Sequence, residues 1–178
     1  RLEPGYAAPD LVTEPLFNEP MVAVVATGHP LAEQPRAGWQ DLARLPCVLP
    51  PPWASLRVKL EQQFHKHGLQ PPTDLVETAS FLALLTVLQR RAAVGFMARS
   101  VAGHFEAAGS VHVLKLPVPV ELPAIGLITL RGRPLTTTTA QLMECLRLAA
   151  AGPAHAGTSP GSAAPRRRST PARRSRAG

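Results

Sequence analysis

The chain has 178 residues, 45% of them hydrophobic, and a formal net charge of +7, which allows one ordinary domain or two small lobes with a real core. Six arginines between residues 166 and 176 supply most of the charge, since the remaining 13 Lys and Arg nearly balance 12 Asp and Glu, so the basic character says little about the folded part. No apolar run approaches the roughly 18 residues that a membrane span needs, and the first residues lack the charged-then-apolar order of a signal peptide.

Short strands and helices are predicted to alternate along most of the chain. Apolar or alternating runs bounded by Pro, Gly or polar residues indicate strands, and apolar residues spaced by three or four indicate helices. The predicted strands cover residues 11–17, 21–27, 47–50, 74–78, 92–98, 111–116 and 124–131. The predicted helices cover residues 39–46, 55–68, 80–91, 99–109 and 136–152. Several strands are apolar throughout, which favours an α/β fold whose parallel-rich sheet is covered on both faces.

Residues 149–178 form a tail of mostly Ala, Pro, Ser, Gly, Thr and Arg. Such a composition buries too little surface to offset the entropy cost of ordering, which predicts disorder. The arginine run could contact nucleic acid or acidic partners through charge alone, although a solvated tail is the preferred interpretation. Cys47 and Cys145 lie far apart in apolar surroundings, which predicts buried free thiols in a reducing compartment and therefore a cytoplasmic protein.

No motif predicts catalysis or metal binding. His29 stands between a glycine and a proline at the end of an apolar strand, where it could be a catalytic base or only part of a turn. His65 and His67 are roughly 200° apart around a predicted helix, so they cannot chelate one ion from one face. The sequence GTSPG (157–161) matches a serine-hydrolase pattern but lacks the strand and helix that must flank the nucleophile. We therefore expect no catalytic residue, no metal and no cofactor.

Two strand-to-helix loops indicate a ligand site. One strand runs through residues 51–54 into a helix at Ser55, and another runs through Thr78 and Ala79 into a helix at Ser80. Helix N-termini offer free N–H groups that suit carboxylates, and loops at the carboxyl ends of strands bind ligands in open α/β sheets. Each serine could instead be only a helix N-cap. Two such loops in neighbouring units favour a shared pocket.

Four stretches of the sequence are similar to one known family. They are EPLFNEPMVAVVATGHPLAE (14–33), WQDLARLPCVLPPPWASLRVKLEQQF (39–64), VETASFLALLTVLQRRAAVGFMARSVA (76–102), and LPAIGLITLRGRPLT with QLMECLR (122–147). In register over about residues 1–148, the chain resembles the effector-binding domain of LysR-type transcriptional regulators. The most similar subgroup is the one named for a galactose-binding-protein regulator.

The resemblance implies a fold like that of type 2 periplasmic solute-binding proteins, with two α/β lobes joined by two crossovers. Lobe I would include residues 1–30 and the return 122–148, lobe II residues 45–115, and the crossovers residues 31–44 and 116–121. Family members begin with a winged helix-turn-helix, a linker helix and the first half of lobe I. The chain would therefore be N-terminally truncated with its first lobe incomplete, and exposed strand edges predict poor stability.

The resemblance also implies a function without catalysis. The chain would be the effector-binding portion of a DNA-binding transcriptional regulator that senses a small polar or acidic metabolite between the lobes. Expected partners are that effector, DNA through a helix-turn-helix domain absent from this chain, further copies in a dimer or tetramer, and RNA polymerase indirectly. The expected effector contacts are Trp53, Ala54, Ser55, Thr78, Ser80 and Met97.

Two alternatives stay open from the sequence. A solute-binding protein of a transport system would share the fold but carry a signal peptide where a regulator carries its helix-turn-helix. An α/β hydrolase would need a nucleophile on a strand-to-helix turn with a base in reach, and none is found.

Ala98 and Arg99 follow the strand that contains Gly95 and Phe96, where family members usually have a proline, and this departure would reshape the cleft wall. His29 would lie at the exit from lobe I and make a local hydrogen bond.

Overall fold

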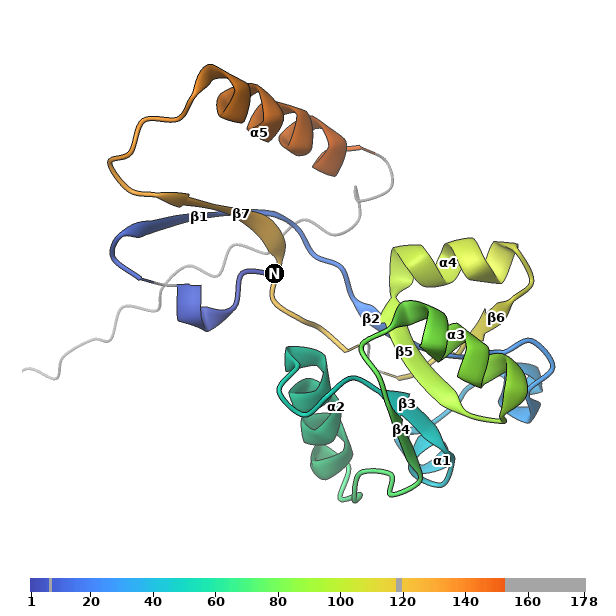
Figure 1. Ribbon diagram of the computed structural model, residues 1–178. Helices are drawn as coiled ribbons and strands as arrows, with labels where there is room; N and C mark the ends of the chain where they lie inside the picture. The colour runs from blue at the N-terminus through green and yellow to red at the C-terminus, as the bar shows by residue number, and fades with distance from the viewer. Residues whose placement is uncertain (7, 118–119, 153–178) are drawn as a thin grey trace, which may run out of the picture.

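The computed structural model describes residues 1–6, 8–117 and 120–152, and its strands form two separate sheets. Strands β1 (Leu11–Phe17) and β7 (Ile125–Leu130) pair antiparallel, and helix α5 (Thr137–Ala150) packs on them. We call β1, β7 and α5 the two-stranded unit. Figure 1 shows that this unit lies to one side of the remaining elements, joined to them by two extended connections.

The second group, the five-stranded unit, contains a mixed sheet in the order β4-β3-β5-β2-β6. Its strands are β2 (Met21–Ala26), β3 (Cys47–Leu49), β4 (Leu75–Glu77), β5 (Val94–Ala98) and β6 (Val111–Val113). Strand β3 runs parallel to β4 and β5, whereas β2 runs antiparallel to β5 and β6. The expected sheet is therefore present, but only part of it is parallel.

Helices cover both faces of the five-stranded sheet, as Figure 1 shows. They are α1 (Trp39–Ala43), α2 (Ser55–Lys66), α3 (Phe81–Arg90) and α4 (Arg99–Ala107), with short 3-10 turns η1 (Pro4–Tyr6) and η2 (Pro30–Glu33). Alternate side chains of β2 point to opposite faces. Ala23 joins a core cluster with Leu42 and Phe64 from α1 and α2, while Val24 joins a second cluster with Leu88 from α3.

The placement of β2 corrects the lobe boundary expected from the sequence. Residues 1–30 were assigned to lobe I, yet β2 lies inside the five-stranded sheet between β5 and β6. The apolar run identified a strand buried on both faces, but it carried no information about which sheet would bury it. Residues 31–44 are not a crossover either, because Leu31, Trp39 and Leu42 are buried in the same core cluster as β2.

The connections between the two units are shorter than expected and lie elsewhere. Residues 18–20 link β1 to β2, and residues 121–124 lead from Val120, which bridges to Met21, to β7. The Arg1 guanidinium donates to the carbonyls of Glu19 and Pro123, at 3.0 Å each, and so joins both connections. The second crossover was predicted at residues 116–121, and only residue 121 of that range lies in the observed connection 121–124.

The turn after β2 explains the sequence around His29. Gly28 has φ +90°, a conformation that glycine adopts without steric cost. The His29 side chain is buried, and its Nδ1 accepts a hydrogen bond from the Leu31 N–H at 3.1 Å, which caps η2. Burial lowers the pKa of His29, although the backbone carbonyl of Ala92 opposes the shift. The expected local hydrogen bond is confirmed.

One expectation about the last helix, a buried Cys145, is wrong. Cys47 is buried, and burial together with Asp74 raises the pKa of its thiol to about 12, but Cys145 on α5 is exposed. Leu142 and Leu146 are 58% and 40% exposed, whereas Met143 is buried. A two-stranded sheet covers only a narrow stripe of a helix, so the wider apolar face remains open. Helix α5 also extends to residue 150, beyond the predicted start of the tail at 149; residues 153–178 lie outside the described part.

Candidate functional site

A pocket of about 280 Å³ lies at one edge of the five-stranded sheet. The parallel strands β3, β4 and β5 end at this edge, with Pro50, Thr78 and Ala98 at or just beyond their carboxyl ends. Because β2 runs antiparallel to β5, its first residue, Met21, stands opposite Ala98. The pocket therefore occupies the edge where open α/β sheets bind ligands, beside the connection that enters β2.

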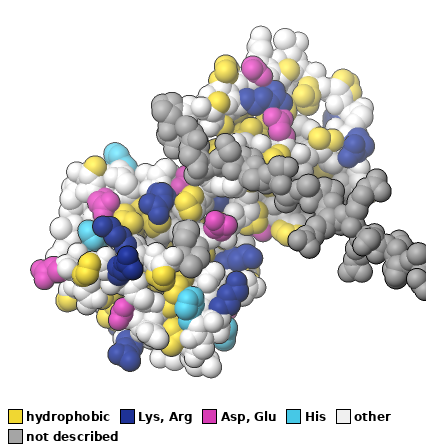
Figure 2. Space-filling view, turned by 180° about the vertical axis from the view of Figure 1, so that it is seen from behind, with side chains coloured by type: hydrophobic (Ala, Val, Ile, Leu, Met, Phe, Trp, Pro, Cys, Tyr) yellow, Lys and Arg dark blue, Asp and Glu magenta, His cyan; other side chains and the backbone are white. Residues whose placement is uncertain are grey.

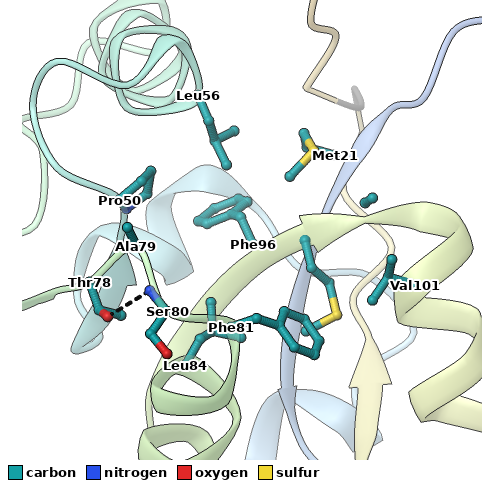
Figure 3. Close-up of a pocket in the computed structure, with 12 residues that line it drawn as sticks. Met21, Pro50, Leu56, Thr78, Ala79, Ser80, Phe81, Leu84, Phe96 and Val101 are labelled. Carbon is teal, nitrogen blue, oxygen red and sulfur yellow. Dashed lines mark hydrogen bonds between the residues drawn. The ribbon is translucent and has the colours of Figure 1, made fainter. Parts of the chain in front are cut away.

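Apolar side chains form most of the pocket wall. The complete lining is Met21, Pro50, Leu56, Thr78, Ala79, Ser80, Phe81, Leu84, Phe96, Met97, Ala98 and Val101. Figure 3 shows the Phe96 ring between Leu56 of α2 and Met21, with Phe81 and Val101 toward the side of α3 and α4. None of these residues carries a charge or a titratable group, so this lining can bind a molecule but offers no acid or base for a reaction.

Thr78 and Ser80 supply the polar side chains of the pocket. The Thr78 Oγ1 accepts a hydrogen bond from the Ser80 N–H at 3.0 Å, and the Ser80 Oγ accepts one from the Ala83 N–H at 3.3 Å. A hydroxyl group has one donor in addition to its acceptor lone pairs. In the part of the chain that the structure describes, neither hydroxyl donates to another group. Both O–H groups are therefore available to a ligand.

Three helices begin near the pocket, and the N–H groups of their first turns have different hydrogen-bond partners. Ser80 caps α3 with its side chain. The Pro20 carbonyl accepts from the Arg99 N–H, and the buried Glu19 carboxylate accepts from the Ser100 N–H, both at 3.0 Å, so the connection before β2 caps α4. Helix α2 has no side-chain cap, because its N-cap is Ala54. The predicted cap Ser55 is instead the first residue of that helix.

Arg57 ties together the two loops that follow β3 and β4. Its side chain is only 11% exposed and forms an ion pair with Glu61 at 2.6 Å. Its Nη1 lies 3.3 Å from the Pro50 carbonyl oxygen and 3.6 Å from the Glu77 carboxylate. One partly buried guanidinium thus fixes α2 against the ends of both strands, which holds the pocket wall in place.

The structure brings together half of the predicted contact residues. Thr78, Ser80 and Met97 line the pocket. Trp53, Ala54 and Ser55 do not line it, and the Trp53 side chain is 81% exposed. Both predicted loops border the pocket, but a loop of three prolines and a tryptophan gave no means of telling which way its side chains point.

Sequence reasoning missed most of the apolar wall. The residues it did not propose include Met21, Leu56, Phe81, Phe96 and Val101. Each lies in a predicted strand or helix, and a side chain that lines a pocket has the same pattern as one that fills a core. No local motif could have identified them.

The described residues contain neither a metal-binding cluster nor a membrane span. In residues 1–6, 8–117 and 120–152, no three His, Cys, Asp or Glu side chains come close enough together to hold a metal ion. Within the same residues, no helix has the length and apolar character required to cross a membrane.

Comparisons with known proteins agree on one family. The model of the LysR substrate binding domain matches residues 1–151. The HTH-type transcriptional regulator GalR of Pseudomonas putida is 31% identical over 146 residues, which are 82% of this chain and 36% of that protein. The chain thus spans about a third of the length of this relative.

Solved structures show the same fold. HinK, a LysR family transcriptional regulator from Pseudomonas aeruginosa, has a TM-score of 0.69 at 20% identity, covering 84% of this chain and 51% of that one. The regulatory domain of Synechocystis CcmR, solved in complex with 2-PG, has a TM-score of 0.64 at 17% identity, covering 79% and 67%. The expected α/β fold of the type 2 periplasmic-binding-protein kind is confirmed. The chain belongs to the LysR family of transcriptional regulators, and residues 1–151 are its substrate-binding domain.

Proposed function

We propose that the chain is the sensing part of a DNA-binding transcriptional regulator and that its effector binds in the pocket at the carboxyl ends of β3, β4 and β5. The observation that carries this proposal is the position of the pocket. It lies at the sheet edge that faces the connections to the two-stranded unit, because Met21 both lines it and bridges to Val120.

The connections offer a route from the pocket to the rest of a regulator. A ligand held against Met21 and Ala98 touches the residues that adjoin Pro20 and Arg99, where the connection is bonded to α4. Closure of the two-stranded unit over the ligand would change these contacts. A ligand that prefers the closed arrangement shifts the population toward it. The size of the shift is limited by the difference between the ligand's affinities for the closed and the open arrangement.

The remaining partners follow from the family. DNA would be bound by a helix-turn-helix region outside these residues, in a cytoplasmic dimer or tetramer that acts on RNA polymerase indirectly. No enzymatic activity is proposed, since the residues lining the pocket include no acid, base or thiol. The family match speaks against a transport-type solute-binding protein.

A reporter assay tests the proposal. The protein is expressed from its whole gene, its binding sites on the genome are mapped, and a bound promoter is fused to a reporter. Compounds are then screened for a change in transcription. Val101 lines the pocket near the start of α4 and is 37% exposed, and Val58 on α2 is 44% exposed and lies outside the pocket. Both sites tolerate a charge, because neither is fully buried.

Val101→Asp is expected to abolish the response to the compound, because a charge in an apolar pocket must be desolvated when the ligand binds. Val58→Asp is the matched control and is expected to respond as the unmodified protein does. Occupancy of the genomic sites should persist in both variants. A Val101→Asp protein that responds normally would mean that the effector binds elsewhere.

A further inference from the structure

The chemistry of the pocket wall indicates the class of its ligand. Resting on the proposed function, we propose that the effector is a carboxylate carried on an aromatic or alicyclic ring with few other polar groups. The sequence resemblance implied only a small polar or acidic metabolite, so the proposal narrows that class to an amphipathic ring acid.

The apolar side of the ligand follows from the side chains that it would contact. Phe81 and Phe96 contribute rings, and Met21 and Met97 contribute thioethers (Figure 3). Rings pack well against other rings and against methionine sulfur. A sugar would bring several hydroxyl groups into a pocket with only two polar side chains, and a hydroxyl that loses water without gaining a partner weakens binding. The wall therefore favours a ring with an apolar face.

The polar side of the ligand follows from Thr78 and Ser80. Figure 3 shows the two hydroxyl groups together on one side of the pocket. Each oxygen already accepts one hydrogen bond, from the N–H group of Ser80 or of Ala83, and each hydroxyl keeps its O–H donor for a ligand. Two adjacent donors at the start of α3 suit the two oxygens of one carboxylate, and the positive end of the helix dipole favours its charge.

The size of the pocket sets the size of the ring. Its volume of about 280 Å³ is at or below the lower limit of pockets that take drug-sized molecules, which begin near 300 Å³. One six-membered ring with a short acid side chain fits such a space. The smallest probes of the class are benzoate, phenylacetate and cyclohexanecarboxylate.

Calorimetry on the protein expressed from its whole gene tests the class. The three ring acids are titrated beside benzyl alcohol, which has the ring without the charge, and galactose, which is a neutral ring with several hydroxyl groups. At least one ring acid is expected to bind, and Val101→Asp is expected to abolish its binding while Val58→Asp leaves it unchanged. Thr78→Val is expected to weaken binding of the acid at least about tenfold, the usual cost of losing a hydrogen bond to a charged group, with little effect on the binding of benzyl alcohol. Thr78→Ser keeps the hydroxyl and should restore the affinity.

Three results would overturn the proposal. If galactose binds in a manner sensitive to Val101→Asp and the acids do not bind, the pocket and its sensing function stand but the class is wrong. If the acids bind equally well to the Val101→Asp protein, they occupy another place. If none of the three acids binds at millimolar concentration, the class is also wrong, and the reporter assay with Val101→Asp decides separately whether the sensing function survives.

Discussion

His29 caps a turn, as its place between a glycine and a proline led us to expect. Its Nδ1 accepts from the Leu31 N–H, so the ring must be unprotonated at that nitrogen in the folded state. Burial lowers the pKa of His29 below the ordinary value of 6.5. A histidine beside a glycine and a proline is here a turn-capping residue, and its chemistry concerns stability and not catalysis.

A pH dependence of stability follows from this assignment. Above pH 6.5 the ring is neutral in both the folded and the unfolded chain, so it makes no pH-dependent contribution. Below pH 6.5 the unfolded chain takes up a proton that the folded chain resists, so the free energy of unfolding falls. In urea unfolding at pH 7.5 and 5.5, the His29→Asn variant should lose less stability than the unmodified protein, since an asparagine oxygen can still accept from the Leu31 N–H. If both proteins lose the same free energy of unfolding between pH 7.5 and 5.5, the pH dependence comes from titratable groups other than His29.

The two thiols should react at very different rates. Cys145 is exposed on α5, while Cys47 is buried with its pKa raised to about 12. Only the thiolate is nucleophilic, so Cys47 is protected both by burial and by protonation. A maleimide added to the native protein at pH 7.5 is expected to label Cys145 first and Cys47 only on unfolding, as peptide mass spectrometry would show. Rapid native labelling of Cys47 would contradict its placement in the core.

At the scale of elements, two glycines should respond oppositely to the same substitution. A Cβ atom at Gly126 of β7 would overlap the Glu14 carbonyl oxygen and lie 2.7 Å from Cδ1 of Leu2, whereas one at Gly103 of α4 would meet nothing within 4 Å. Gly126→Ala should therefore cost about 1–3 kcal/mol through overpacking against β1. Gly103→Ala should gain about 0.5–1 kcal/mol through helix propensity. Both changes are measured by chemical denaturation, and a stabilising Gly126→Ala would contradict the β1–β7 register.

The order and type of the elements were largely predictable from local patterns. The apolar runs of β3 and β5 and the glycines after α2 and α4, Gly68 and Gly109 with φ near +70°, mark strands and helix ends directly. The pairing of strands that lie far apart in the sequence could not be predicted. Strand β2 was identified correctly, but its antiparallel neighbours β5 and β6 lie about 70 to 90 residues away. The sequence held no local information about these partners.

At the scale of the whole molecule, the two units differ in how well they are buried. The five-stranded unit has a core on each face of its sheet. In the two-stranded unit, Val12, Ile128 and Leu130 are 41%, 39% and 46% exposed, and Figure 2 shows hydrophobic side chains on its surface. Among the described residues, β1 and β7 pair only with each other, so each leaves one edge free.

Free edges beside exposed apolar side chains predict self-association. The polypeptide of residues 1–178, purified alone, is expected to form aggregates or to unfold over a broad temperature range. The range is broad because the two-stranded unit unfolds at a lower temperature than the five-stranded unit. Size-exclusion chromatography with calorimetry checks this. A monomer that unfolds in one sharp two-state transition would contradict it.

The candidate site was predictable only as a location. The loops after β3 and β4 were predicted to share a pocket, and Thr78, Ser80 and Met97 line the pocket at that sheet edge. The wall itself combines residues from β2, β5 and three helices that are brought together by the fold. A pocket assembled from separate apolar segments leaves no continuous motif in the sequence.

The three methionines of the chain allow the most direct test of the central claim, that the pocket is the effector site. Met21 and Met97 line the pocket, and Met143 is buried in the two-stranded unit. The measurement is methyl NMR of the whole-gene protein with labelled methionine, titrated with the compound to which the reporter responds. The account predicts that the Met21 and Met97 signals shift together along one saturation curve while the Met143 signal stays in place. A saturating compound that leaves Met21 and Met97 unmoved would contradict it.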